Sequence, residues 1–214
     1  MSETPETAPK TSGIRNTVLV IVSAIAVMLG LFVSNVMTPK QLTADQYQTL
    51  GYYGFPEPRT IKPFSLLDEA GNTVGTADLK GQWSLLYFGF TFCPDICPTT
   101  LGVLNRAVKQ TQIPPQIVLV SVDPERDTPA VLAQYLSGFN KSFKGYTGTF
   151  DDVVGLATNV NVAFGKIPGA MPGTYTVDHS SSIVVVDPFG RYAGFIKQPH
   201  QAEKIASIVD SLQR

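Results

Sequence analysis

The chain has 214 residues, of which 43% are hydrophobic and only 15% are charged, so it can bury a packed core and is not a disordered charged protein. Lys and Arg number 16 against 17 Asp and Glu, and a net charge of −1 excludes the broad basic surface of a nucleic-acid-binding protein. With 2 cysteines, it is neither a disulfide-rich scaffold nor a four-cysteine zinc module.

The first predicted element is a membrane span. No charged residue occurs from Asn16 to Pro39, and Val18–Val36 is mostly apolar. A helix of that length nearly crosses a hydrocarbon core of about 30 Å. We therefore expect a transmembrane helix at 16–38 after a tail at 1–15. A cleaved signal peptide is the alternative, although the apolar run is longer than most signal-peptide cores.

The charges that flank this span predict its orientation. Lys10 and Arg15 precede it and Lys40 follows it, so the tendency of basic flanks to stay in the cytoplasm places residues 1–15 inside. The tail is poor in Arg, unlike a mitochondrial transit peptide. We expect a single-pass protein of a bacterial inner membrane, with its C-terminal domain in the periplasm. In that oxidising compartment, two cysteines either form a disulfide or hold a metal.

The remainder is predicted to be a linker at 39–58, rich in Pro and Gly, and one α/β domain at 59–214. In chain order the predicted elements are strands at 64–67 and 83–90, a helix at 98–110, a strand at 117–122, helices at 129–139 and 151–164, a hairpin of strands at 182–186 and 191–196, and a helix from about 199 to 212. A βα-alternating half joined to an antiparallel hairpin predicts a three-layer α/β fold of thioredoxin type.

Cys93 and Cys97 lie between the apolar strand at 83–90 and the next helix, where α/β sheets place ligand chemistry. A helix N-terminus favours thiolate, so we expect a depressed pKa for at least one cysteine. Pro98 disfavours helical geometry at Cys97, which predicts an irregular or distorted first turn with both sulfurs facing one spot. The pair could close a disulfide or chelate a soft metal. A structural disulfide and two unrelated buried thiols are the plainer alternatives.

The chain has two histidines. In a thioredoxin-like topology His179 would face the cysteine loop, although a single His is more often a structural residue. His200 is expected at the surface. A set of two Cys and one His is too small for structural zinc or an iron–sulfur cluster, whereas copper, as Cu(I) or Cu(II), suits soft thiolate and imidazole ligands.

Residues near these side chains have weaker predicted roles. Met171 could be an auxiliary soft ligand, but a gap-filling or exposed side chain is the plainer expectation. Asp95 could cap the loop or contact a partner, and Asp178 could orient the ring of His179. The charged segment 123–127, between a strand and a helix, is expected to supply charged capping residues to that helix rather than to form a functional loop.

Three segments, FGFTFCPDICPTTL, SVDPERDTP and VDHSSSIVVVDPFGR, resemble the Sco/SenC family of cytochrome c oxidase assembly proteins. The resemblance covers nearly all of residues 60–212. It implies a thioredoxin-like domain that binds copper through Cys93, Cys97 and His179 and helps to mature the dinuclear copper centre of oxidase subunit II. Many relatives have His where Phe92 stands, so this chain lacks one possible extra ligand but keeps the other three.

Two functions follow from the resemblance and compete for the same sulfurs. A metallochaperone would carry copper and pass it on by ligand exchange, without being an enzyme in the usual sense. A thiol–disulfide oxidoreductase would instead reduce the cysteines of subunit II. The expected partners are subunit II and a periplasmic copper donor or thiol reductant. A peroxidase-like redox sensor is a third alternative on the same fold.

Overall fold

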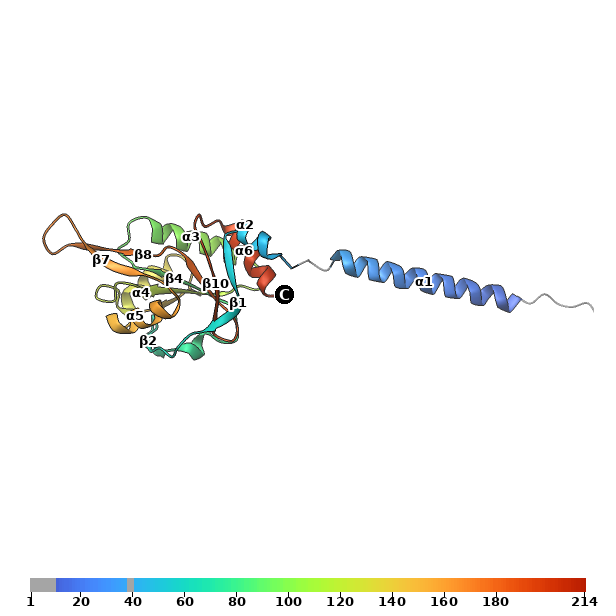
Figure 1. Cartoon of the computed structure of the whole chain (residues 1–214), viewed down its shortest axis with the longest axis horizontal. Coiled ribbons are helices and arrows are strands. Elements are labelled where there is room, and N and C mark those ends of the chain that lie inside the picture. The colour runs from blue at the N-terminus through green and yellow to red at the C-terminus, as the bar shows by residue number, and fades with distance from the viewer. Residues whose placement is uncertain (1–10, 38–40) are drawn as a thin grey trace, which may run out of the picture. The chain divides into compact units, whose positions relative to one another are not determined.

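The computed structural model describes residues 11–37 and 41–214 (Figure 1). Two compact units divide at Gln41 and Leu42. The N-terminal unit contains helix α1 (Thr11–Met37), whose segment Arg15–Val33 has a mean hydropathy of 2.5 and no burial. By length and composition α1 fits a membrane anchor. It begins before the predicted span at 16–38, and residues 38–40 and the tail up to residue 10 lie outside the described residues.

The C-terminal unit is a mixed α/β domain. Its helices are α2 (Ala44–Thr49), α3 (Ile96–Val108), α4 (Pro129–Ser137), α5 (Phe150–Asn159) and α6 (Ala202–Leu212), with a 3-10 turn at Thr76–Leu79. Its strands are β1 (Tyr52–Thr60), β2 (Leu66–Leu67), β3 (Thr73–Val74), β4 (Ser84–Gly89), β5 (Gln116–Ser121), β6 (Lys144–Tyr146), β7 (Phe164–Pro168), β8 (Tyr175–His179), β9 (Ile183–Val186) and β10 (Arg191–Ile196).

Six strands form the central sheet in the order β1-β10-β9-β4-β5-β6. Strands β4, β5 and β6 run parallel, and β9, β10 and β1 continue the sheet antiparallel. Every residue of β4 is buried, because helices cover both faces of the sheet. Helices α3 and α6 pack on each other, and α4 and α5 lie on the other side of the sheet in Figure 1. The predicted layers and hairpin are therefore confirmed.

The predicted linker at 39–58 is wrong over most of its length, because it contains α2 and most of β1. Strand β1 lies at the edge of the sheet, where Pro56 and Pro58 are tolerated despite lacking an N–H group. The pairing register shifts between Gly54 and Arg59, which is where those prolines lie. Proline and glycine therefore mark an irregular edge strand here, not a linker.

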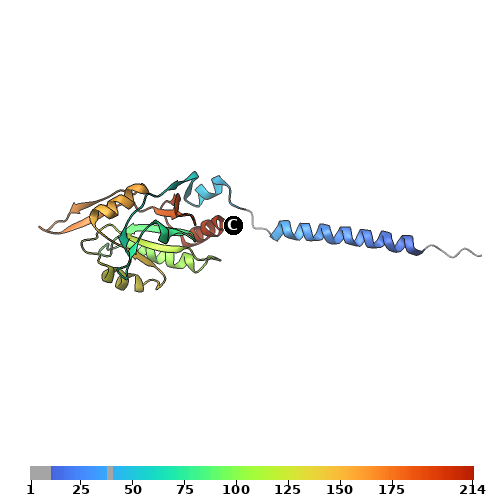
Figure 2. The same ribbon diagram turned by 90° about the horizontal axis from the view of Figure 1, so that it is seen from below.

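The predicted helix at 151–164 is too long at its C-terminal end. Helix α5 ends at Asn159, and Asn161 has a φ of 56°, a left-handed conformation that cannot continue the helix. Phe164 then begins β7, which pairs antiparallel with β8 so that Phe164 lies opposite His179. The β7–β8 hairpin was not predicted. It forms a separate two-stranded sheet that projects from one end of the unit in Figures 1 and 2.

Candidate metal centre

The cysteine loop joins β4 to α3. The backbone at Asp95 is irregular, with φ −138° and ψ −68°, and the helix begins at Ile96, so Cys97 lies inside its first turn. Pro98 does not prevent this, because the N–H groups of a first turn have no partner within the helix. One of these free groups, the backbone N–H of Cys97, donates to Cys93 Sγ at 3.4 Å. The side chain of Asp95 makes no capping hydrogen bond and is exposed.

His179 ends β8, and its ring is oriented by the backbone. The carbonyl oxygen of Ser180 accepts a hydrogen bond from Nδ1 at 3.1 Å. Since a carbonyl can only accept, we assign the ring hydrogen to Nδ1, which leaves the Nε2 lone pair 3.6 Å from Cys97 Sγ. The group that orients the ring is therefore the Ser180 carbonyl rather than Asp178, whose side chain is exposed.

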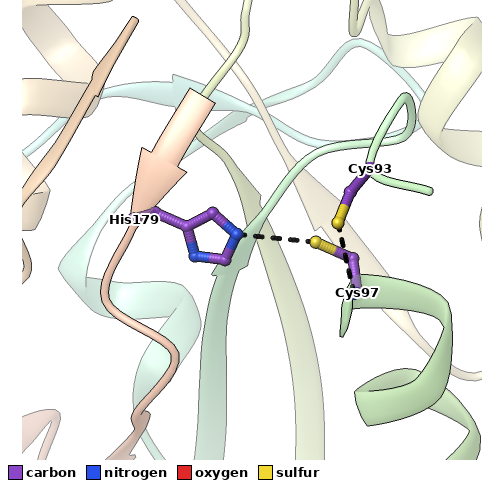
Figure 3. A group of neighbouring side chains, drawn as sticks. All are labelled: Cys93, Cys97 and His179. Carbon is purple, nitrogen blue, oxygen red and sulfur yellow. Dashed lines mark hydrogen bonds between the residues drawn. The ribbon is translucent and has the colours of Figure 1, made fainter. Parts of the chain in front are cut away.

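The three predicted ligands converge on one point. The sulfurs of Cys93 and Cys97 and a ring nitrogen of His179 all lie within 4.8 Å of one another (Figure 3). Both cysteines are free thiols, with exposures of 8% for Cys93 and 0% for Cys97. A pocket of about 430 Å³ is lined in part by His179, which is half-buried. The geometry brings the set together; coordination of a metal by it stays a prediction.

The protonation states differ from those expected. Burial and the neighbouring Cys93 thiol raise the pKa of Cys97 to about 12, the reverse of the depression expected at a helix N-terminus. Desolvation outweighs the helix dipole because the Cys97 side chain is fully buried. Burial also lowers the pKa of His179. At neutral pH the pair is therefore a thiol facing a neutral imidazole, and a metal that binds must displace the thiol proton.

Aromatic side chains of β4 and its following turn enclose this pair. The rings of Tyr87 and Phe90 both meet the His179 ring edge-on, with centroids 6.0 Å apart in each case. The Tyr87 hydroxyl donates to Cys97 Sγ at 3.8 Å and is fully buried. Sequence reasoning did not single out Tyr87. The available signal was a tyrosine within an apolar buried strand, since a buried hydroxyl needs a hydrogen-bond partner.

The charged segment 123–127 is not a solvated helix cap. Asp123 and Asp127 both have 0% exposure. Asp127 accepts hydrogen bonds from the backbone N–H and the hydroxyl of Thr91, at 3.0 and 2.6 Å, and from the Ser121 hydroxyl at 2.7 Å. Thr128 caps helix α4, as its position before Pro129 predicts, and accepts a hydrogen bond from the Val131 N–H. The aspartate therefore ties the cysteine loop to the end of β5.

Three other residues considered from the sequence are not members of this set. His200 is half-buried rather than exposed, and its Nε2 donates to the Ser181 carbonyl at 2.9 Å. Met171 is 68% exposed in the loop between β7 and β8, which rules out a gap-filling role. Phe92 is 63% exposed beside Cys93. An auxiliary ligand role for Met171 stays a prediction.

Comparison with known proteins identifies the family. Residues 55–214 match the SCO1/SenC family. The chain belongs to the SCO1/SenC family. It is 39% identical over 156 residues to the mitochondrial SCO2 homolog of Bos taurus, a match that covers 71% of this chain and 58% of that protein. It is 36% identical over 162 residues to a putative copper-binding protein of Stutzerimonas stutzeri, covering 73% of this chain and 78% of the other.

Solved structures of relatives confirm the thioredoxin-like Sco fold. Arabidopsis thaliana ScoI with copper bound gives a TM-score of 0.68 at 32% identity, covering 72% of this chain and 99% of that one. Yeast Sco1 with copper bound gives 0.67 at 36% identity, with coverages of 73% and 90%. BsSco, a member of the Sco family of cytochrome c oxidase assembly proteins in which a disulfide switch was identified, gives 0.55 at 25% identity, with coverages of 73% and 95%.

Proposed function

We propose that this SCO1/SenC protein carries copper and delivers it to the dinuclear copper site of cytochrome c oxidase subunit II. One observation carries the proposal: the two sulfurs of the cysteine loop and the imidazole nitrogen of His179, which is distant in the chain, converge within 4.8 Å. The copper-bound structures of Sco relatives support copper as the cargo. The oxidase assembly role of the family supports an oxidase subunit as the acceptor.

The donor set suits copper better than other metals. Thiolate and imidazole are soft or intermediate ligands, and Cu(I) is stable with two or three of them. Structural zinc requires a fourth protein ligand. Among the described residues, the group of potential His, Cys, Asp and Glu ligands consists of Cys93, Cys97 and His179. The orientation of His179 by Ser180 leaves its Nε2 lone pair free to bind an ion.

A three-ligand site also suits transfer. An incoming cysteine of the acceptor can bind the ion while the carrier ligands still hold it, and one carrier sulfur then leaves without any change in the oxidation state of copper. We expect Cys93 to exchange with the acceptor first, since it lies in the loop and is 8% exposed, whereas Cys97 is fully buried in α3. Cys97 regains its proton when the ion has left.

The proposed setting is a bacterial inner membrane. Helix α1 anchors the chain with a single pass, and the C-terminal unit lies in the periplasm, supported by the basic residues Lys10 and Arg15 before the span. A periplasmic donor supplies copper, or a thiol reductant keeps Cys93 and Cys97 reduced. Either partner would have to reach the same exposed face of the cysteine loop.

Copper uptake by the reduced full-length chain in detergent tests the proposal. We expect about one Cu(I) per chain, bound tightly enough to survive a competing chelator. Cys93→Ser, Cys97→Ser and His179→Ala should each lose the ion to that chelator, whereas His200→Ala serves as the matched control and should retain it. A wild-type chain that takes up no copper, or a Cys93→Ser variant that still retains it tightly, would overturn the proposal.

A second candidate function is reduction of the subunit II disulfide. Cys93 is the more exposed of the two sulfurs and would be the attacking group. Cys93 would form a mixed disulfide and release the first acceptor thiol. Cys97 would then close the Cys93–Cys97 disulfide and release the second, which balances two electrons. The disulfide switch of BsSco supports this alternative.

The variant His179→Ala distinguishes the two functions. Reduction uses only sulfur atoms, so a reductase should keep its rate toward an oxidised subunit II peptide when the imidazole is removed. A copper carrier should lose copper retention in the same variant. If His179→Ala retains copper fully but loses reductase activity, both assignments are wrong.

A further inference from the structure

The hairpin that carries His179 is not part of the central sheet. Strands β7 and β8 form their own two-stranded sheet, whereas β4, which leads to the cysteines, lies in the middle of the six-stranded one. In Figure 1 the outer end of the hairpin extends beyond the rest of the unit. The hydrogen bonds of the central sheet therefore fix the cysteine side of the site but not the histidine side. Another part of the chain must hold His179 within reach of Cys97.

Arg126 contacts the hairpin at Tyr175, the first residue of β8. Its guanidinium carbon lies 4.0 Å from the centroid of the Tyr175 ring, and its Nη1 donates to the Tyr175 carbonyl at 3.5 Å. Arg126 also forms an ion pair with the buried Asp123, which accepts a hydrogen bond from the Tyr175 hydroxyl at 2.8 Å. Tyr175 and His179 are the two ends of one short strand, so these contacts fix the strand that carries the imidazole.

The same guanidinium contacts the cysteine loop. Its carbon lies 4.9 Å from the ring centroid of Phe92, next to Cys93, and 5.9 Å from that of Phe90. The following residue, Asp127, holds Thr91 through two hydrogen bonds. One arginine therefore lies between the two arms of the site, with aromatic rings of the cysteine loop on one side and of β8 on the other.

We propose that Arg126 is a positioning residue that holds β8, and with it His179, against the cysteine loop. This inference deepens the proposed function. The role of Arg126 in holding β8 is independent of copper, whereas its consequence, that copper has three ligands rather than two, rests on the proposed function. The Nη2 group of Arg126 is buried and has no hydrogen-bond partner among the residues that the structure describes. A buried unpaired donor lowers stability, so stacking and the ion pair with Asp123 are what keep the arginine there.

The rings of Tyr87 and Phe90 contact the His179 end of β8, at centroid distances of 6.0 Å, and the remaining contacts of the hairpin are weaker. Lys166 of β7 lies 2.6 Å from Glu125, but the two side chains are 35% and 61% exposed, and exposed ion pairs contribute little. The hairpin base is also joined by the Ser180 N–H, which donates to the Ala163 carbonyl at 2.9 Å, within the same hairpin. Neither of these two contacts reaches the cysteine loop, whereas Arg126 contacts both Tyr175 of β8 and Phe92 of that loop.

The test compares Arg126→Met with Arg191→Met in the full-length, metal-free chain. Arg191 is a matched control, because it also pairs with a mostly buried aspartate, Asp187, at 2.7 Å, and lies 4.9 Å from the ring of Phe189. We expect amide hydrogen exchange in β7 and β8 to quicken about tenfold in Arg126→Met, with β4 unchanged and the control like wild type. Arg126→Lys should restore protection only in part, since an ammonium group cannot stack as a guanidinium does.

Copper coordination supplies the second readout. X-ray absorption of the Cu(I)-loaded chain should show two sulfurs and one nitrogen in wild type and Arg191→Met, but two sulfurs alone in Arg126→Met, with copper lost to a chelator about tenfold faster. Equal exchange and equal coordination in the two Met variants would overturn the inference. A wild type that binds no copper would overturn the proposed function, while hydrogen exchange would still decide the role of Arg126. If Arg126→Met does not fold, Arg126→Gln makes the same comparison.

Discussion

Burial gives the two cysteines different chemistry. Cys97 is enclosed by the helix start and by Tyr87, and its pKa is raised to about 12 by desolvation. Cys93 lies outside the helix and accepts a hydrogen bond from the Cys97 backbone. A single C-x-x-x-C motif therefore contains one sulfur held in the core and one near the surface, which suits both a ligand that stays and a ligand that exchanges.

Tyr87→Phe tests the hydrogen bond to the buried sulfur. Removing the hydroxyl keeps the ring against His179 but deletes the donor to Cys97 Sγ. A hydrogen bond of this kind contributes about 1 kcal/mol, so the free energy of unfolding of the metal-free chain should fall by about that amount.

Tyr87→Phe should also change the copper-loaded chain. Hydrogen bonds to a ligating sulfur raise the reduction potential of bound copper, so that potential should be lower in the variant than in wild type. Chemical denaturation and redox titration measure these effects; an unchanged potential would mean that Tyr87 does not tune the site.

His200 should make stability depend on pH. Its Nε2 donates to the Ser181 carbonyl, its buried Nδ1 has no partner within residues 11–37 and 41–214, and burial lowers its pKa. The folded chain therefore binds this proton less readily than the unfolded chain does. The stabilising contribution is complete above the unfolded pKa of about 6.5 and is lost as pH falls through the folded value, by at most about 1.4 kcal/mol per pH unit.

His200→Gln should remove this part of the pH dependence. Free energies of unfolding from pH 8 to pH 5 should fall less steeply in the variant than in wild type. The pKa of His179 is lowered as well, so the free energy of unfolding should still depend on pH through that residue in both wild type and His200→Gln. Parallel curves for wild type and His200→Gln would contradict the account of His200.

At the scale of elements, the pattern of apolar residues in the sequence predicted the buried strands of the core but not the exposed hairpin strand β7 or the edge strand β1. Strand β4 and the hairpin of β9 and β10 are apolar runs buried by helices, and such runs can be recognised in a sequence as buried strands. Strand β7 is mostly exposed, so it has no apolar alternation to detect. Strand β1 has two prolines and a register shift, which its edge position permits.

The candidate site was predictable to the same extent. The approach of His179 to Cys93 and Cys97 follows from topology, which the strand and helix order predicted. The contributions of Tyr87 and Arg126 depend on side-chain direction across elements distant in sequence, which one sequence does not encode in a readable pattern.

The segment from β5 to α4 stabilises the cysteine loop, and Asp127→Ala tests this. The change leaves the N–H and hydroxyl of Thr91 and the Ser121 hydroxyl without their acceptor in a buried setting. We expect the free energy of unfolding to fall by about 3 kcal/mol, with weaker copper retention. Asp95→Ala is the control in the same region, because Asp95 is exposed and makes no capping hydrogen bond.

Chemical denaturation of both variants measures this difference. Asp95→Ala should lie within about 0.5 kcal/mol of wild type, as surface changes usually do. If Asp127→Ala were as stable as Asp95→Ala and bound copper equally well, the buried aspartate would have no part in holding the loop.

At the scale of the whole molecule, the chain has a unit with an apolar helix fitted to a membrane and a unit of thioredoxin-like Sco fold. The net charge of −1 provides little long-range attraction for a partner. Recognition of the proposed acceptor would therefore depend on short-range contacts, for which Phe92, 63% exposed beside Cys93, is available.

The coordination of Cu(I) in the full-length chain tests the central claim most directly. X-ray absorption should show two sulfur ligands and one nitrogen ligand in wild type and in His200→Ala, and two sulfur ligands without the nitrogen in His179→Ala. A nitrogen ligand that persists in His179→Ala, or a reduced wild-type chain without bound copper, would contradict the claim that Cys93, Cys97 and His179 together hold the ion.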